Sequence, residues 1–295
     1  MSEPFGPELT SIRSPKVKAA RQLAKRALRL RARSFLAEGP QAVGEALASG
    51  DVVSQVFITA SARARHPELA EQAARQGAHV QAVSGEVMAG LAQTITPQGV
   101  LAVCRYVDIP LARLAAAAPR LVAILANVRD PGNAGTVLRT ADAAGAAGVI
   151  FSDASVDPYN SKCVRATAGS IFHLPLVAGA PVAEAVTAMR GAGLRIVAAD
   201  GRAGRSLDET VPGGPEEPGG PLGRPTAWLF GNEAWGLPAD MLALADDVVA
   251  VPIYGKAESL NLAAAAAVCL YASAHASRAS QTTRPGGAPS ARIQR

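Results

Sequence analysis

The stretch that decides the fold is Leu121-Val-Ala-Ile-Leu-Ala126, followed by Asn127-Val-Arg-Asp-Pro-Gly-Asn-Ala-Gly-Thr-Val-Leu-Arg139. Its first six residues form a continuous apolar run, which is typical of a parallel strand buried on both faces. The following segment contains Gly132 and Gly135, where a backbone can approach a ligand closely, and a helix is predicted from Thr136 onward. A strand, a glycine-bearing loop and a helix in this order predict an α/β domain with a candidate site in the loop.

The alternation of strands and helices continues on both sides of this stretch. Toward the C-terminus, strands are predicted at 149–152, 194–199, 226–230 and 247–252, and helices at 182–190, 239–245 and 260–277. Toward the N-terminus, the pattern predicts a strand and turn at 35–40, strands at 52–59, 79–83 and 99–107, and helices at 15–33, 41–48, 66–76 and 86–92. We therefore expect an α/β protein in which residues 34–108 form a small domain, 109–119 a linker and 120–277 a parallel-sheet domain.

Basic residues are concentrated at the two ends of the chain. The net charge is +5 over 295 residues, yet residues 13–33 carry nine basic side chains and no acidic one, and residues 278–295 carry four. The body between them is acidic. We therefore treat residues 1–33 as a basic arm and 278–295 as a disordered tail. Charge alone leaves two interpretations of the arm open, a solvated basic helix or a surface that binds a polyanion.

The composition argues against several classes of protein. Cys104, Cys163 and Cys269 stand far apart and none belongs to a Cys-x-x-Cys pair, so neither a disulfide framework nor a zinc site is expected. The four histidines lack the helical spacing of a histidine metal site. The longest uncharged apolar run, around Leu260 to Ala274, is too short to span a bilayer, and the N-terminus lacks the apolar region of a secretory signal. We expect a cytoplasmic protein that holds no metal and does not enter a membrane.

Two further loops follow predicted strands and carry polar side chains. Leu229-Phe-Gly-Asn-Glu-Ala-Trp-Gly-Leu-Pro238 places Glu233 between two glycines, and Val251-Pro-Ile-Tyr-Gly-Lys-Ala-Glu-Ser-Leu-Asn261 leads into the last helix. Taken singly, Glu233 fits a carboxylate at the N-terminus of the helix that follows Pro238, and Ser259 fits the N-cap of the last helix. In a parallel sheet, however, ligands bind at the carboxyl ends of the strands, where all three loops are expected. Neither a dinucleotide fingerprint nor a phosphate-binding loop is present.

Together the three loops resemble a known set of motifs. Asn-x-x-x-x-x-Arg at Asn133 and Arg139, Gly-x-Glu-x-x-Gly from Gly231 and Pro-x-x-Gly-x-x-x-Ser-Leu-Asn ending at Asn261 are similar, in order and spacing, to the motifs of the SpoU/TrmH family of RNA ribose 2′-O-methyltransferases. The resemblance covers residues 121–277. It includes Arg165-Ala-Thr-Ala-Gly-Ser-Ile-Phe-His-Leu-Pro175, and three N-terminal segments resemble the family's substrate-binding domain: Phe35-Leu-Ala-Glu-Gly-Pro40, Glu45-Ala-Leu47 and Thr96-Pro-Gln-Gly-Val100.

The resemblance implies a fold, a reaction and a cofactor. Family members fold the catalytic domain with a deep trefoil knot, bind S-adenosylmethionine in the knot and form homodimers whose protomers share the active site. An arginine stays protonated, so we expect Arg139 to fix the 2′-hydroxyl and a neighbouring phosphate rather than to act as a lone base. The implied catalytic residues are Arg139, Asn133, Glu233, Ser259 and Asn261. The implied cofactor-binding residues are Gly231, Val251, Leu260, Leu229 and Ile253.

The expected partner is RNA. Contacts with it are expected at Arg13, Lys16, Lys18, Arg21, Lys25, Arg26 and Arg165. A separate substrate domain favours ribosomal RNA, and we expect the 23S RNA, whereas the basic N-terminus leaves transfer RNA open. Two other classes stay in view, a noncatalytic RNA-binding or assembly protein of the same fold and a nucleotide-dependent α/β enzyme. The intact motif residues count against the first, and the missing nucleotide fingerprints count against the second.

Overall fold

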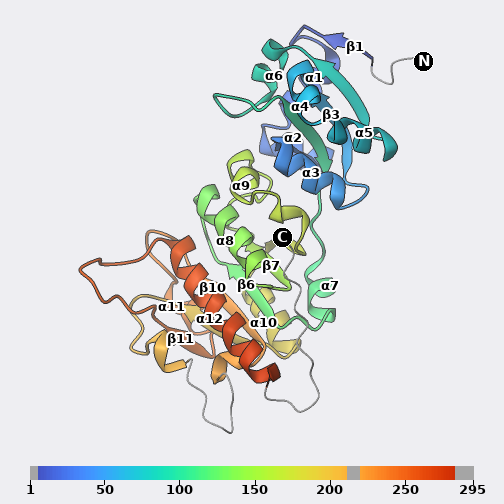
Figure 1. The fold of residues 1–295 in the computed structure, drawn as a ribbon. Coiled ribbons are helices and arrows are strands. Elements are labelled where there is room, and N and C mark those ends of the chain that lie inside the picture. Colours follow the sequence, from blue (N-terminus) through green and yellow to red (C-terminus); the bar gives the residue numbers. More distant parts are fainter. Residues whose placement is uncertain (1–5, 211–219, 283–295) are drawn as a thin grey trace. The chain divides into compact units, whose positions relative to one another are not determined.

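The computed structural model describes residues 6–210 and 220–282 (Figure 1). The chain divides into two compact units. The first contains residues 1–108, 131–139 and 156–174, and the second contains residues 109–130, 140–155 and 175–295. Two segments that follow the expected linker, 131–139 and 156–174, therefore pack with residues 1–108.

The first unit is built on a five-stranded sheet in the order β1-β4-β3-β5-β2. Its strands are β1 (Gly6–Leu9), β2 (Ser34–Glu38), β3 (Val53–Ile58), β4 (His79–Val83) and β5 (Val100–Arg105). Strand β4 is parallel to both β1 and β3, whereas β5 is antiparallel to both β2 and β3. The helices are α1 (Pro15–Gln22), α2 (Arg26–Ala32), α3 (Pro40–Ala48), α4 (Ala60–Arg65), α5 (Pro67–Arg75), α6 (Gly85–Leu91) and α9 (Ser161–Ala166).

The second unit is built on a six-stranded sheet in the order β11-β9-β10-β6-β7-β8, in which every pairing is parallel. Its strands are β6 (Leu121–Leu125), β7 (Gly148–Ser152), β8 (Leu176–Ala180), β9 (Arg195–Ala199), β10 (Thr226–Phe230) and β11 (Asp247–Val249). Its helices are α7 (Leu111–Ala116), α10 (Val182–Gly191), α11 (Ala239–Leu242) and α12 (Leu262–Thr282). The predicted parallel-sheet α/β fold is confirmed.

The central strands of this sheet are buried on both faces, as their apolar sequences predict. Every residue of β6 and β10 is buried. The largest buried side chain, Trp228 in β10, donates its indole N–H to Ser273 Oγ in α12 at 2.9 Å, so its polar atom is satisfied inside the core. Helix α12 is thereby fixed to the middle of the sheet.

Helix α8 (Pro131–Ala143) continues directly from the loop after β6 and has residues in both units. It begins five residues before the predicted start at Thr136, because Pro131 is suited to the first helical position and the glycines behind it are accommodated inside the helix. Gly135 has a reason to lack a side chain. A Cβ there would lie 2.4 Å from the carbonyl oxygen of Cys163 and 2.7 Å from the Cβ of Ala166, so α8 packs directly against α9.

The basic arm expected at residues 1–33 is part of the first unit. The single helix expected at 15–33 is two helices, α1 and α2, and Val17, Ala20 and Leu23 are buried in one apolar cluster with residues of α6. The α1 face is therefore a wall of the core, and only its outer side is available to a ligand. Residues 1–5 lie outside the described part of the chain.

Other differences concern short elements. The expected linker at 109–119 contains α7, whose Leu114 is buried in the core of the second unit. Strands β1 and β8 and helices α4 and α9 were not expected. The last helix begins at Leu262 and extends to Thr282, so the start of the expected disordered tail is helical, and residues 283–295 lie outside the described part.

Candidate active site

The candidate site lies where strands β6, β9 and β10 end. Strands β6 and β10 are neighbours in register, with Leu125 opposite Phe230, and β9 pairs with β10 on its other side, with Ala199 opposite Phe230. The backbone N–H of Ala126 donates to the carbonyl of Phe230 at 2.8 Å, so pairing continues to the strand ends. The loops after these strands leave the same edge of the sheet, which is where parallel sheets bind ligands.

The loop after β10 is closed by its own hydrogen bonds. The N–H of Asn232 donates to the carbonyl of Gly236 and the N–H of Gly236 to the carbonyl of Asn232, both at 2.9 Å. Gly236 has φ +72°, which favours glycine, and a Cβ on Gly231 would lie 2.5 Å from the Gly236 carbonyl group. The two glycines of the motif are therefore required by the close approach of the loop's two ends.

Asn232 ties this loop to the loop after β6. Its buried side chain donates from Nδ2 to the carbonyl of Asn127 at 2.8 Å and accepts at Oδ1 from the N–H of Ala234 at 2.8 Å. Asn127 has the left-handed conformation, with φ +58°, and its N–H donates to Ser152 Oγ at 3.1 Å. The first two motif loops thus share one hydrogen-bond network.

Glu233 completes that network. Its carboxylate accepts from the N–H of Asp130 at 3.1 Å and from the N–H of Arg129 at 3.2 Å. These two residues immediately precede α8, so the negative charge sits at the helix N-terminus, where it is electrostatically favourable. The simpler interpretation of Glu233 as a helix-terminus carboxylate is thus correct for its contacts, although the helix is α8 rather than the one after Pro238.

A cavity of about 160 Å³ opens beside these loops in the second unit. Among its lining residues are six that the sequence singled out: Gly231, Glu233, Val251, Ile253, Ser259 and Leu260. Val251, Ile253 and Leu260 give it an apolar wall, and Gly201, Gly231 and Gly236 bring backbone groups to its surface. Apolar walls with backbone hydrogen-bonding groups are typical of sites for an aromatic ring such as adenine.

The sequence did not single out Asp200, which also lines the cavity. Its carboxylate is 5 % exposed and pairs with Arg202 at 2.7 Å, and the hydrogen bonds from Arg202 hold the pKa of Asp200 below its ordinary value. Asp200 is thus a charged acceptor at the end of β9. The signal that identifies it is its position, one residue after an apolar strand of the same sheet.

Asn261, not Ser259, caps the last helix. Asn261 Oδ1 accepts from the N–H of Ala263 at 2.9 Å and of Ala264 at 3.4 Å, which is the geometry of an N-cap. The N-cap role predicted for Ser259 therefore belongs to Asn261, and Ser259 instead lines the cavity. Leu229 is fully buried within β10 and belongs to the core cluster. It is not among the residues that line the cavity.

Asn133 and Arg139 lie on α8, within the part of that helix that belongs to the first unit. Arg139 is exposed and Asn133 is half-buried. Gly135 lies between them, where α8 packs against α9. Asn133 and Arg139 therefore belong to the same compact unit as Arg165 and the N-terminal sheet.

The residues expected to contact RNA are mostly on the surface of the first unit. Those in α1 and its surroundings are exposed: Arg13, Lys16, Lys18, Arg21, Lys25 and Arg26. Arg29, one of the nine basic residues of the arm, is buried and pairs with Asp157 at 2.6 Å. Its Nη1 also donates to the carbonyls of Leu23 at 2.9 Å and Ala24 at 2.8 Å, between α1 and α2. Arg29 is therefore a structural cation.

Aromatic residues fix the segment 156–174 to the N-terminal sheet. The Tyr159 ring stacks on Tyr106 with centroids 3.7 Å apart and lies 4.7 Å from Phe35. The Tyr159 hydroxyl donates to Asp108 Oδ1 at 2.7 Å and accepts from the N–H of Val107 at 2.9 Å. Burial and the Asp108 carboxylate raise the pKa of Tyr159, so the hydroxyl stays protonated and can donate.

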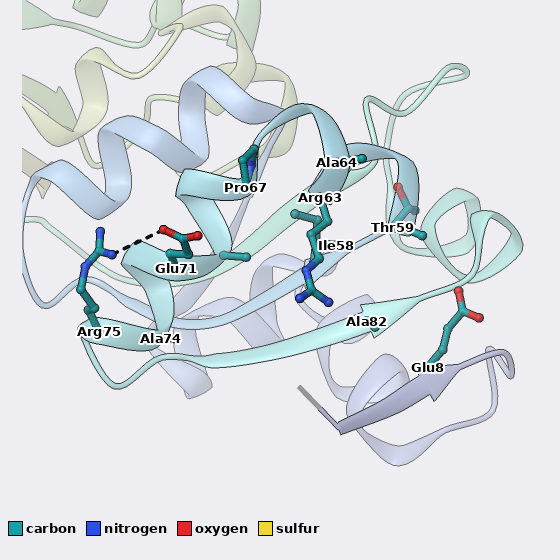
Figure 2. Close-up of a pocket in the computed structure, with 12 residues that line it drawn as sticks. Glu8, Ile58, Thr59, Arg63, Ala64, Pro67, Glu71, Ala74, Arg75 and Ala82 are labelled. Carbon is teal, nitrogen blue, oxygen red and sulfur yellow. Dashed lines mark ion pairs between the residues drawn. The ribbon is translucent and has the colours of Figure 1, made fainter. Parts of the chain in front are cut away.

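A larger cavity, of about 880 Å³, lies elsewhere in the first unit (Figure 2). Helices α4 and α5 and strands β1, β3 and β4 form it, and alanine side chains make up much of its wall. Glu71 and Arg75 form an exposed ion pair at 3.7 Å on its rim. No predicted site residue lines this cavity, so its size alone does not make it the candidate site.

Metal chemistry has no evident place in the described residues. No group of three or more histidine, cysteine, aspartate or glutamate side chains in residues 6–210 and 220–282 could hold a metal ion.

The three cysteines, Cys104, Cys163 and Cys269, are buried free thiols, and burial raises the pKa of Cys269 to about 12. In the described part of the chain, no helix is long and apolar enough to cross a membrane.

Comparison with known proteins identifies both parts of the chain. Residues 120–271 match the SpoU rRNA Methylase family, and residues 14–102 match the MRM3-like substrate binding domain. The chain is 33 % identical over 264 residues to the Bacillus subtilis 23S rRNA (guanosine(2553)-2′-O)-methyltransferase RlmP, covering 90 % of this chain and 98 % of that protein. It is 31 % identical over 226 residues to the Bordetella pertussis 23S rRNA (guanosine-2′-O-)-methyltransferase RlmB, covering 75 % and 88 %.

Solved structures agree over nearly the whole chain. The AdoMet-bound rRNA methyltransferase from Sinorhizobium meliloti superposes with a TM-score of 0.79 at 31 % identity, covering 92 % of this chain and 98 % of that one. The SpoU methyltransferase AviRb from Streptomyces viridochromogenes gives a TM-score of 0.75 at 27 % identity, covering 92 % and 100 %. The similarity therefore includes both units.

Proposed function

The chain belongs to the SpoU rRNA methylase family, and from that premise we propose that it methylates a ribose 2′-hydroxyl of 23S ribosomal RNA, with S-adenosylmethionine as the methyl donor. The observation that carries the proposal is the cavity at the ends of β9 and β10, which gathers residues of the second and third motif loops. The match of residues 14–102 to a substrate-binding domain supports ribosomal RNA over the transfer RNA alternative.

The residues of the cavity fit this cofactor. Val251, Ile253 and Leu260 provide an apolar wall for the adenine, and the cradle at Gly231 has no room for a side chain. Asp200 is a charged acceptor in the cavity wall for hydroxyl or amino groups. When bound, S-adenosylmethionine supplies a methyl group on a positively charged sulfur, which a ribose hydroxyl can attack in line.

The protein's own contribution to the reaction is positioning and charge. A ribose hydroxyl is a weak nucleophile, so it must be oriented and its proton must have an acceptor. We assign Arg139 to holding the hydroxyl and an adjacent phosphate, because a guanidinium donates several hydrogen bonds and does not give up its proton. The phosphate is the proposed proton acceptor. Asn133, nearly two turns earlier on α8, is assigned to positioning the substrate.

Glu233, Asn261 and Ser259 have supporting roles in this proposal. Glu233 holds the loop that leads into α8, and Asn261 holds the start of α12, so each fixes a segment that borders the cavity. Ser259 is assigned to the cavity surface itself. A rigid surrounding of this kind favours catalysis because misplacement by about 1 Å can lower a rate by roughly two orders of magnitude.

We propose the trefoil knot and the homodimer for this chain on the strength of its family membership. An enzyme of ribosomal RNA must meet that RNA, so we also propose that the protein acts in the cytoplasm.

The test is methyl transfer from tritiated S-adenosylmethionine to 23S ribosomal RNA, with transfer RNA as the comparison substrate. We expect label in 23S RNA at a ribose position, mapped by resistance of the neighbouring phosphodiester to alkaline hydrolysis. Arg139→Ala should abolish transfer while S-adenosylmethionine still binds in calorimetry. Full activity of Arg139→Ala contradicts the assigned role. Binding of RNA without methyl transfer by the wild-type protein favours the noncatalytic alternative.

A further inference from the structure

Three segments that the methyl-transfer chemistry leaves unused meet at one cavity in the first unit. Its volume is about 250 Å³, and its wall includes Glu38, Gly39, Thr96, Gln98 and Arg165. We propose that this cavity binds one unpaired guanine base of the RNA substrate. The inference rests on the proposed function, since it names the part of the RNA that the N-terminal sheet and α9 recognise.

Glu38 provides a fixed carboxylate. Its side chain is 9 % exposed, Oε2 accepts from the N–H of Gln93 at 3.0 Å, and Oε1 accepts from the hydroxyl of Thr94. A carboxylate has about four acceptor positions, so each oxygen keeps a lone pair for a further donor. Glu38 can therefore accept two parallel N–H bonds without changing its present contacts.

Arg165 provides a donor that lacks an acceptor. Its Nη1 is buried without a hydrogen bond and lies 3.9 Å from Glu38 Oε2, which is near enough for charge pairing but too far for a hydrogen bond. A buried donor without a partner is unfavourable. A carbonyl oxygen in the cavity would provide the partner after a small movement of the guanidinium.

The space itself depends on Gly39. This residue has φ +95°, and a Cβ on it would lie 2.9 Å from Gln98 Oε1. The Gln98 side-chain amide lies against this bare backbone, and the backbone carbonyl of Gln98 accepts from Arg65 Nη2 at 3.1 Å. Gln98 lines the cavity, and its side-chain amide offers both a donor and an acceptor to a base edge.

An exposed apolar residue stands at the rim. Ile95 lies between Thr94 and Thr96, both of which line the cavity, and its side chain is fully exposed. Bases extruded from RNA or DNA are held by hydrogen bonds to their edges and by apolar or aromatic side chains on their faces. We assign Ile95 to the second kind of contact, because both of its neighbours in sequence line the cavity.

The paired charges favour a base over a phosphate. Glu38 repels a phosphate group and neutralises the attraction of Arg165 for it, whereas a neutral base with both donors and acceptors is complementary to the pair. Among the four bases, guanine presents two parallel N–H donors, N1 and N2, beside a carbonyl oxygen. The volume is below the roughly 300–1,000 Å³ of sites for drug-sized ligands, as expected for one base.

The test uses the full chain saturated with S-adenosylhomocysteine, which keeps nucleotides out of the cofactor cavity, and the positions of the NMR shifts distinguish binding here from binding beside Arg139. We titrate it with 5′-GMP, AMP, CMP and UMP and follow backbone amides and arginine side chains by heteronuclear NMR. GMP should shift residues 93–98 and Arg165, with the other three binding roughly tenfold or more weakly. Glu38→Gln should weaken GMP binding roughly tenfold, since it removes a charged acceptor. Glu71→Gln is the matched control, because Glu71 is an exposed carboxylate on the other cavity of the same unit.

Kinetics with RNA provide a second measurement that does not depend on a buried residue. Ile95→Ala changes an exposed side chain, so it should fold normally and raise KM for RNA several-fold without changing kcat. Equal binding of all four nucleotides, shifts outside this cavity, or unchanged GMP binding by Glu38→Gln would overturn the proposal while methyl transfer by the wild type still stands. A correct GMP pattern in a protein that methylates no RNA would instead contradict the proposed function.

Discussion

Arg29 and Asp157 allow a quantitative test of the finding that the basic arm is part of the core. Their side chains are 5 % and 9 % exposed, and their charged atoms are 2.6 Å apart. Removing one partner of such a pair leaves a buried charge and costs about 3–5 kcal/mol. For a structure of this size each kcal/mol lowers Tm by about 2–4 °C, so Asp157→Asn and Arg29→Met should each lower Tm by about 6–20 °C.

The double variant Arg29→Met/Asp157→Leu should be more stable than the sum of the two single changes predicts, because no unpaired charge remains. It will not recover fully, since the carbonyls of Leu23 and Ala24 lose their donor. Urea and thermal unfolding followed by circular dichroism measure the cycle. Single variants within about 0.5 kcal/mol of the wild type, or simple additivity in the double variant, would refute the reasoning.

Three other predictions concern the cavity at the ends of β9 and β10 and the exposed basic side of α1. Gly231→Ala places a Cβ 2.5 Å from the Gly236 backbone, so we expect at least a roughly tenfold loss of S-adenosylmethionine affinity in calorimetry, and unchanged affinity would contradict the required close approach. The pKa of Asp200 is lowered in the folded protein, so its contribution to stability is present above about pH 4 and is lost as pH falls through the folded pKa. The difference in unfolding free energy between the wild type and Asp200→Asn should therefore shrink below about pH 4 in acid titrations. A difference that grows there would contradict the lowered pKa. The triple variant Lys18→Ala/Arg21→Ala/Lys25→Ala, on the exposed side of α1 and the turn after it, should reduce the slope of log affinity against log salt for RNA by about 0.7–0.9 per lost phosphate contact, while Arg29→Met leaves the slope unchanged.

Sequence patterns were most informative where a residue's surroundings are set by its own strand or loop. The apolar run at 121–126 predicts β6, and the position of Glu233 after a buried strand predicts a site residue. The same reasoning extended to β9 would have identified Asp200, since it too follows an apolar strand of the parallel sheet. The motif loops could be placed at one edge of the sheet because parallel strands end on the same side.

Patterns were less informative where contacts come from distant parts of the chain. Nothing near Arg29 in sequence indicates that Asp157, 128 residues away, neutralises it, so its charge was counted with the surface. The split between α1 and α2 has the same origin, since the carbonyls freed at Leu23 and Ala24 are satisfied by this buried guanidinium. Likewise, Ser259 and Asn261 are both acceptable N-caps by residue type, and only the position of the first helical turn decides between them.

The packing of residues 131–139 and 156–174 with residues 1–108 has a consequence for how this protein can be divided. Two domains that meet at a linker can be exchanged or removed between genes as cassettes. Here, deletion of the first 108 residues would take away the partners of Asp157 and Tyr159 and expose side chains of the part that remains. The residues of the two units are therefore interleaved along the chain, and recombination at residue 108 would leave a fragment whose formerly buried side chains are exposed. Under the proposed function, a change of RNA target is therefore reached more readily by substitutions within the first unit than by exchange of a whole domain.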